Sequence, residues 1–230
     1  MGAVMIGIDV GQQVDPTAIA VCEVEPRNGP RGWEDHYLGR HLERLPLGTP
    51  YPAVADRLAA IIGNVRAHVF DQARRSVGQP TPSLRMDVFI DATGVGKPVA
   101  DVLSGAGLDV IPVYFTHGDR RTVEDRQITL GKAWLVSRLK TLLQTGRLHL
   151  AVSEEAVALQ RELLDYELRV SEDANDRYGA FRVGSHDDLV TALGLAVQGA
   201  DAPPSRSYSY LTGAGDDGQD DDDRREWWTR

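Results

Sequence analysis

The first 45 residues alternate between apolar and polar positions in short runs that are typical of β-strands. Residues 3–11, AVMIGIDVG, are mostly apolar and end in Asp9 and a glycine. Residues 17–25, TAIAVCEVE, alternate and are rich in small and β-branched side chains, so the two runs predict a β-hairpin. Residues 33–45, WEDHYLGRHLERL, predict a third strand with polar residues on one face.

The period changes at Tyr51, where apolar residues begin to recur every three or four positions and predict a long amphipathic helix. Its apolar positions are Val54, Leu58, Ile61, Val65 and Val69. Residues 76–83, SVGQPTPS, end it. The following segments predict a buried strand at 86–91, a short helix at 97–107 and a strand at 109–115. This order of elements predicts parallel neighbouring strands joined by a right-handed crossover.

The second half of the chain predicts mainly helices. One helix, ending near Gly146, has its apolar positions at Ile128, Leu135, Leu139, Leu142 and Leu143. Ser153, followed by two acids, begins another helix. Residues 164–170 and 178–184 alternate on either side of a polar turn and predict an antiparallel hairpin. The last helix follows Ser185, its predicted cap, and carries on one face Leu189, Ala192, Leu193 and Ala196.

Composition predicts one domain over residues 1–200 and a disordered acidic tail over residues 201–230. With 42% hydrophobic residues in a chain of 230, a single core is expected. The tail holds eight acids against four bases and cannot bury enough apolar surface to fold. The single cysteine, Cys22, suits a reducing cytoplasm, and no apolar run approaches the roughly 20 residues of a membrane span.

The net charge of −9 is unevenly distributed along the chain. The tail supplies nearly half of it, whereas residues 117–147 contain seven Lys and Arg residues against three acids. A local basic surface is therefore compatible with an acidic protein, and a nucleic-acid partner is not excluded.

Residues 94–97, Gly-Val-Gly-Lys, suggest a phosphate-binding loop, but the surrounding residues exclude the Walker type. That loop needs a glycine five positions before its Gly-Lys pair and Ser or Thr directly after it. Asp91 and Pro98 occupy those places. Asp91, at the end of a predicted buried strand, is the stronger functional candidate.

Acidic residues stand at the ends of three predicted elements. Asp9 closes the first strand, Asp91 closes the central strand, and Asp187 with Asp188 begins the last helix. If the strands are parallel neighbours, these carboxylates converge and repel one another unless divalent cations neutralise them. Oxygen ligands alone favour Mg²⁺ or Mn²⁺, and a pair of such ions would support phosphodiester hydrolysis without a Ser or Cys nucleophile.

Residues 7–21, 89–103 and 185–197, in this order and separation, resemble the nuclease domain of phage large terminase subunits, and residues 131–150 resemble its next helix and short strand. The resemblance covers about residues 3–199. It implies an α/β, ribonuclease H-like fold: a mixed five-stranded sheet flanked by helices, with an added β-hairpin before the last helix. It also implies a metal-dependent endonuclease that cuts concatemeric double-stranded viral DNA during genome packaging in the host cytoplasm.

Carried over position by position, the resemblance assigns metal ligation and catalysis to Asp9, Asp91, Asp187 and Asp188, with Asp187 favoured over Asp188 as the direct ligand. Asp15 and His186 match neighbouring positions and are expected in supporting roles. The cations expected to contact DNA backbone are Lys97, Arg120, Arg121, Arg126 and Lys132.

The expected partners are double-stranded DNA, a packaging ATPase domain or chain, and a portal or small terminase bound through the tail, where Trp227 and Trp228 lie. Three alternatives stay open. They are a Holliday-junction resolvase, a DNA-docking module without catalysis, and a fragment of an actin-like or sugar-kinase ATPase, whose first phosphate loop residues 7–21 also resemble.

Overall fold

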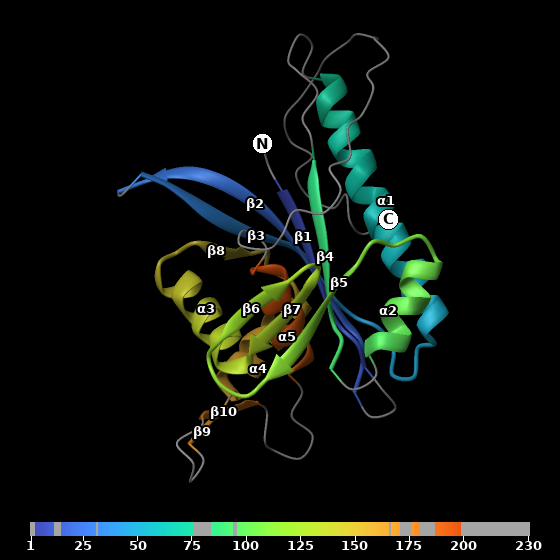
Figure 1. The fold of residues 1–230 in the computed structure, drawn as a ribbon. Helices are drawn as coiled ribbons and strands as arrows, with labels where there is room; N and C mark the ends of the chain where they lie inside the picture. The colour runs from blue at the N-terminus through green and yellow to red at the C-terminus, as the bar shows by residue number, and fades with distance from the viewer. Residues whose placement is uncertain are drawn as a thin grey trace.

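A computed structural model of the chain describes residues 3–11, 15–30, 32–75, 84–93, 96–165, 167–170, 176–179 and 187–198. Its centre is a mixed sheet with helices on both faces (Figure 1). The strands of this sheet are β1 (Ala3–Asp9), β2 (Ala18–Gly29), β3 (Gly32–Arg44), β4 (Arg85–Asp91), β5 (Ile111–Thr116), β6 (Arg121–Glu124), β7 (Gln127–Gly131) and β8 (Leu148–Leu150). The helices are α1 (Tyr51–Arg75), α2 (Gly96–Gly105), α3 (Lys132–Gln144), α4 (Glu154–Asp165) and α5 (Asp188–Ala196).

The order of strands in the sheet is β6-β7-β5-β4-β1-β2-β3-β8. β1 pairs antiparallel with β2 and parallel with β4, and β4 pairs parallel with β5. These pairings confirm the predicted N-terminal hairpin and the predicted parallel neighbours. The five expected strands, β1 to β5, form the middle of the sheet, and β6, β7 and β8 widen it to eight.

The predicted hairpin before the last helix is also present. β9 (Glu167–Val170) pairs antiparallel with β10 (Asp176–Gly179), so the second strand begins two residues earlier than its pattern suggested. The predicted cap Ser185 and the predicted tail, residues 201–230, lie outside the described residues. None of the described helices is both long and apolar enough to cross a membrane.

The placement of Ile128 in a helix was wrong. Ile128 belongs to β7, and α3 begins only at Lys132. Residues 127–131 alternate, so Ile128 and Leu130 both point into the core while β7 lies parallel beside β5. The strand predicted from residue 109 likewise starts later, at Ile111.

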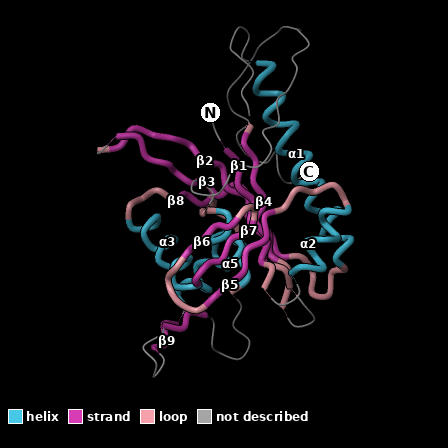
Figure 2. The backbone as a smooth tube through the Cα atoms, in the orientation of Figure 1, coloured by secondary structure: helices cyan, strands magenta, loops and turns pink. Residues whose placement is uncertain are grey.

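The single core expected from composition is in fact two hydrophobic clusters, one on each face of the sheet, with α1 and α2 on one side and α3, α4 and α5 on the other (Figures 1 and 2). Val4, Ile6 and Ile8 of β1 pack with residues of α1 and α2. Met5, on the other face, packs with residues of α3, α4 and α5. Since side chains alternate along a strand, Gly7 and Asp9 share the face of Met5, toward α5.

α5 is enclosed by protein around its whole circumference. Every residue from Asp188 to Ala196 is buried, whereas the sequence pattern placed only one apolar face toward the core. The helix lies directly on the sheet because Gly7 of β1 has no side chain: a Cβ at Gly7 would lie 2.0 Å from the carbonyl oxygen of Ala192. This close approach fixes how far the start of α5 stands from the end of β1.

Candidate active site

Asp9 and Asp91 stand side by side at the ends of the two central parallel strands. The register pairs Ile8 with Ile90, so the next residues of the two strands are the two aspartates. Neighbouring strands lie about 4.8 Å apart. Asp91 has the same parity along β4 as Phe89, which belongs to the core under α5, and so faces the same side of the sheet as Asp9.

The first turn of α5 brings the third and fourth carboxylates to this edge of the sheet. α5 packs against Gly7 through Ala192 and Ala196, and the charges of Asp187 and Asp188 act on Asp9, so the start of the helix lies near the end of β1. Asp187 is the residue before the helix and Asp188 is the first within it. The structure thus brings together the acids of three segments that are far apart in the sequence.

The pKa values of the two strand-end acids record this convergence. Burial raises the pKa of Asp9 well above its usual range, and the charges of Asp91, Asp187 and Asp188 raise it further, whereas Lys132 lowers it. The pKa of Asp91 is raised chiefly by burial and also by the charge of Asp187, against the lowering effects of hydrogen bonds from Thr93 and of Lys132. Burial is thus the main cause of both raised pKa values, and for Asp91 the effect of Lys132 exceeds that of Asp187.

Two further contacts define the neighbourhood of Asp91 and Asp187. The backbone N–H of Thr93 donates to Oδ1 of Asp91 over 2.8 Å, and the hydroxyl of Thr93 accepts from the N–H of Phe115 over 2.8 Å. Lys132, the first residue of α3, lies with Nζ 3.5 Å from Oδ2 of Asp187 and above the ring of Phe115. Lys132 is therefore a local cation beside the acids.

Asp187 and Asp188 differ in their surroundings. The side chain of Asp187 is 26% exposed, whereas that of Asp188 is 5% exposed and has its Oδ2 3.5 Å from Nε of Arg44. Asp187 therefore faces the accessible side of the cluster, and Asp188 faces the interior, where Arg44 and Glu162 lie.

The donor set suits a hard divalent cation, although the acids do not enclose one. Among the described residues, no three His, Cys, Asp or Glu side chains are close enough together to hold a metal ion as they stand. The four neighbouring carboxylates offer only oxygen donors, which Mg²⁺ and Mn²⁺ prefer. Since burial and mutual repulsion disfavour the charged form of Asp9, a cation here would relieve a cost that the fold already carries.

The structure describes one of the two expected supporting residues, Asp15. Asp15 is exposed in the connection that precedes β2. His186 lies outside the described residues, as does the side chain of Lys97.

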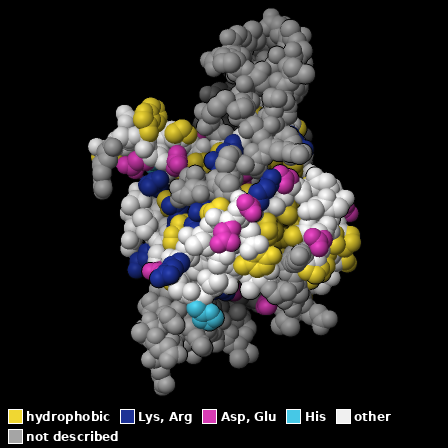
Figure 3. All heavy atoms as spheres, viewed as in Figure 1, with side chains coloured by type: hydrophobic (Ala, Val, Ile, Leu, Met, Phe, Trp, Pro, Cys, Tyr) yellow, Lys and Arg dark blue, Asp and Glu magenta, His cyan; other side chains and the backbone are white. Residues whose placement is uncertain are grey.

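The cations expected to bind DNA are mostly engaged by the protein itself. Nε of Arg121 lies 3.5 Å from Oε1 of Gln198, and its guanidinium lies over Trp134. Arg126 forms an ion pair of 2.8 Å with Asp109, while Arg120 is exposed. Figure 3 shows basic and acidic side chains interspersed among the described residues of the visible face.

The sequence pattern did not reveal the partners of the acids. Thr93, Arg44 and Glu162 carry no motif that separates them from ordinary turn and surface residues, because their roles depend on neighbours remote in the sequence. The burial of Glu162, which is 6% exposed, became visible only in the structure.

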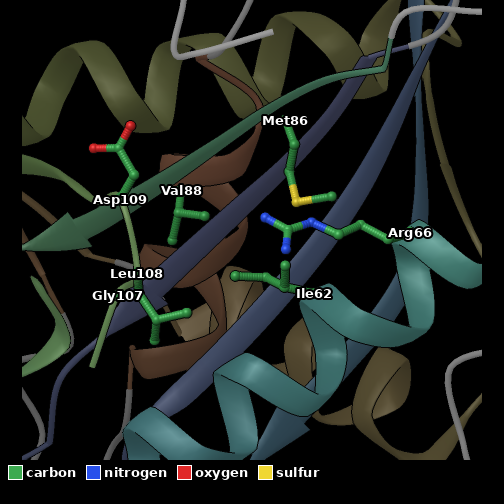
Figure 4. A pocket seen from close by; sticks show the side chains of 7 residues that line it. All are labelled: Ile62, Arg66, Met86, Val88, Gly107, Leu108 and Asp109. Atoms are coloured by element: carbon green, nitrogen blue, oxygen red, sulfur yellow. The ribbon is translucent and has the colours of Figure 1, made fainter. Parts of the chain in front are cut away.

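A pocket on the opposite side of the sheet is separate from this cluster. It lies between Ile62 and Arg66 of α1, Met86 and Val88 of β4, and residues 107–109 before β5 (Figure 4). Met86 and Val88 belong to the core under α1 and α2, so the pocket and the carboxylates are on different faces.

Several solved structures have the same fold as this chain. The nuclease domain of the large terminase from the thermophilic phage G20c, solved with bound magnesium, matches with a TM-score of 0.57 and 21% identity over 86% of this chain and 82% of that one. The corresponding domain of Thermus phage P74-26 matches with a TM-score of 0.55 and 19% identity, over 87% and 83%. The human cytomegalovirus terminase nuclease domain, soaked with manganese and bound to an inhibitor, matches with 0.53 and 14%, over 86% and 83%.

At the level of sequence, no protein-family model and no curated protein matches the chain. The structural matches extend over most of this chain and most of each domain. The chain therefore has the ribonuclease H-like fold of the large terminase nuclease domains.

Proposed function

We propose that this protein is a metal-dependent endonuclease that hydrolyses phosphodiester bonds of double-stranded DNA. The observation that carries the proposal is the meeting of Asp9, Asp91 and Asp187 at one edge of the sheet, with raised pKa values for Asp9 and Asp91. Similar folds solved with magnesium or manganese support the choice of cation.

Asp9, Asp91 and Asp187 would hold the divalent cations, and the charges of the other acids already act on Asp9. Bound cations of this kind supply Lewis acidity to a phosphodiester and to an attacking water. The N–H of Thr93 orients the carboxylate of Asp91, and Lys132 offers positive charge to a phosphate that reaches Asp187. Asp188 stays paired with Arg44 in the interior, which makes Asp187 the direct ligand in this scheme.

Digestion of supercoiled plasmid in Mg²⁺, in Mn²⁺ and in chelator tests the proposal. Cleavage should require the metal, and D91A should lose more than the roughly 100-fold that follows the loss of an outer-shell partner. D56A is the matched control, because Asp56 is an exposed acid of α1 on the other face of the sheet. Metal-independent cutting, or full cutting by D91A, contradicts the assignment.

The same similarity supports a finer proposal about the substrate and partners of this nuclease. The substrate would be concatemeric viral DNA cut during genome packaging in the host cytoplasm, with a packaging ATPase as the partner that holds the DNA. The net charge of −9 and the engaged arginines support weak DNA binding by the isolated protein. Residues 201–230 would serve as a docking segment for a portal or small terminase, with the remainder as the nuclease domain.

A further inference from the structure

The first turn of α5 is capped by a residue of another helix. The residue before a helix normally uses an Asp, Asn, Ser or Thr side chain to accept a hydrogen bond from the N–H two or three positions inside the helix. Asp187 occupies that position, yet its side chain makes no capping hydrogen bond. The N–H of Val190, the third helical residue, instead donates to Oε2 of Glu162 in α4 over 3.0 Å.

Glu162 is itself held in place by an ion pair with Arg44, whose side chain is 29% exposed. The side chain of Glu162 is 6% exposed, and its Oε1 meets the guanidinium of Arg44, the last residue of β3. Nε of the same arginine lies 3.5 Å from Oδ2 of Asp188. Three charged side chains from β3, α4 and α5 are thus joined beneath the start of α5.

This arrangement has a cost that a purely structural role would not require. Burying charged groups is unfavourable, and an apolar contact could join α4 to α5 at least as well. An Asp carboxylate already stands at the capping position and could satisfy the Val190 N–H without help from another helix. What the external cap achieves is to leave the Asp187 carboxylate turned outward, where it lies beside Lys132 and raises the pKa of Asp91.

We propose that Glu162 is a positioning residue that caps α5 in place of Asp187 and so keeps the Asp187 carboxylate available to divalent cations. Arg44 fixes Glu162 and Asp188 in this arrangement. The metal in this inference rests on the proposed function. The capping of α5 by Glu162 in place of Asp187 is a property of the fold and needs no metal.

The first measurement is Mn²⁺ binding to the DNA-free protein by titration calorimetry. E162A removes the external cap, so Asp187 turns back to Val190, and the dissociation constant for Mn²⁺ should rise roughly 10- to 100-fold. E162Q keeps an oxygen acceptor for the Val190 N–H and should restore most of the affinity. E43A is the matched control and should leave the affinity unchanged, because Glu43 is paired with Arg57 of α1.

The second measurement needs no metal. In chelator, D187A should leave the melting temperature of the wild-type background unchanged, because Asp187 makes no capping hydrogen bond there. In the E162A background Asp187 has become the cap, so D187A should lower the midpoint by about 2 to 4 °C further. Additive effects of the two substitutions overturn the inference, as does an E162A protein that binds Mn²⁺ like the wild type or like E43A.

The two measurements separate this inference from the proposed function. A wild-type protein that binds no Mn²⁺ and cuts no DNA refutes the nuclease and the metal part of the inference together. A wild-type protein that binds and cuts, with additive D187A and E162A effects, leaves the nuclease standing and refutes the role of Glu162.

Discussion

Substituting Gly7 by alanine tests whether the contact between β1 and α5 sets the geometry of the carboxylates. The added Cβ would lie 2.0 Å from the carbonyl oxygen of Ala192 and 2.6 Å from the backbone nitrogen of Ala196, and real Cβ atoms essentially never come closer than 3.0 Å to such atoms. Because both obstacles are backbone, no side chain can rotate away, and α5 must retreat from the sheet by about 1 Å.

Two consequences of that retreat are measurable. Overpacking of this kind destabilises by about 1 to 3 kcal/mol, which lowers the melting temperature of a domain of this size by roughly 3 to 10 °C. The same movement carries Asp187 away from Asp9, and a misplacement of about 1 Å at a reacting site can reduce turnover roughly 100-fold. Metal-dependent plasmid cleavage should therefore fall by about that factor at a temperature where G7A is still folded.

G63A is the matched control for this experiment. Gly63 is an exposed residue of α1, and a Cβ there would meet nothing within 4 Å. Alanine favours a helix over glycine, so G63A should gain up to about 1 kcal/mol and keep full activity. A G7A protein with the melting temperature and cleavage rate of the wild type would refute the reasoning from the close contact.

Two further predictions concern titratable groups. The pKa values of Asp9 and Asp91 are raised in the fold, so the metal-free folded protein holds protons that the unfolded chain has released. The free energy of unfolding should therefore fall as the pH rises from about 4 through the folded pKa values. Thermal melts in chelator should show this fall, and D91N should weaken it. At neutral pH, Mn²⁺ at about 100 times its dissociation constant should restore about 2.7 kcal/mol. A pH slope in D91N identical to that of the wild type contradicts the explanation. Burial raises the pKa of the Cys22 thiol to about 12, so a thiol reagent at pH 8 should label the protein only in denaturant, and rapid labelling of the native protein would show that β2 opens readily.

The meeting of Asp9 and Asp91 could be predicted from the sequence because the signals that place each acid lie within its own segment. Apolar runs of strand length end at Asp9 and Asp91, and a crossover between them favours parallel strands, so the two acids meet for reasons contained in their own segments. A Walker-type nucleotide loop could likewise be excluded from a short stretch of sequence, because Asp91 stands where that loop has its first glycine.

Other features were decided only by contacts between remote residues. Ile128 has the spacing of a helical position but pairs with β5, and α5 has one apparent apolar face but is buried on every side. The orientation of Asp187 depends on Glu162, whose acceptor oxygen reaches the Val190 N–H from 28 positions away in the chain. A periodic pattern shows which residues avoid water. It does not show which distant residue accepts a given hydrogen bond or pairs with a given charge. That choice is made when the sheet and helices pack, and here it determines which aspartate faces the accessible side of the cluster.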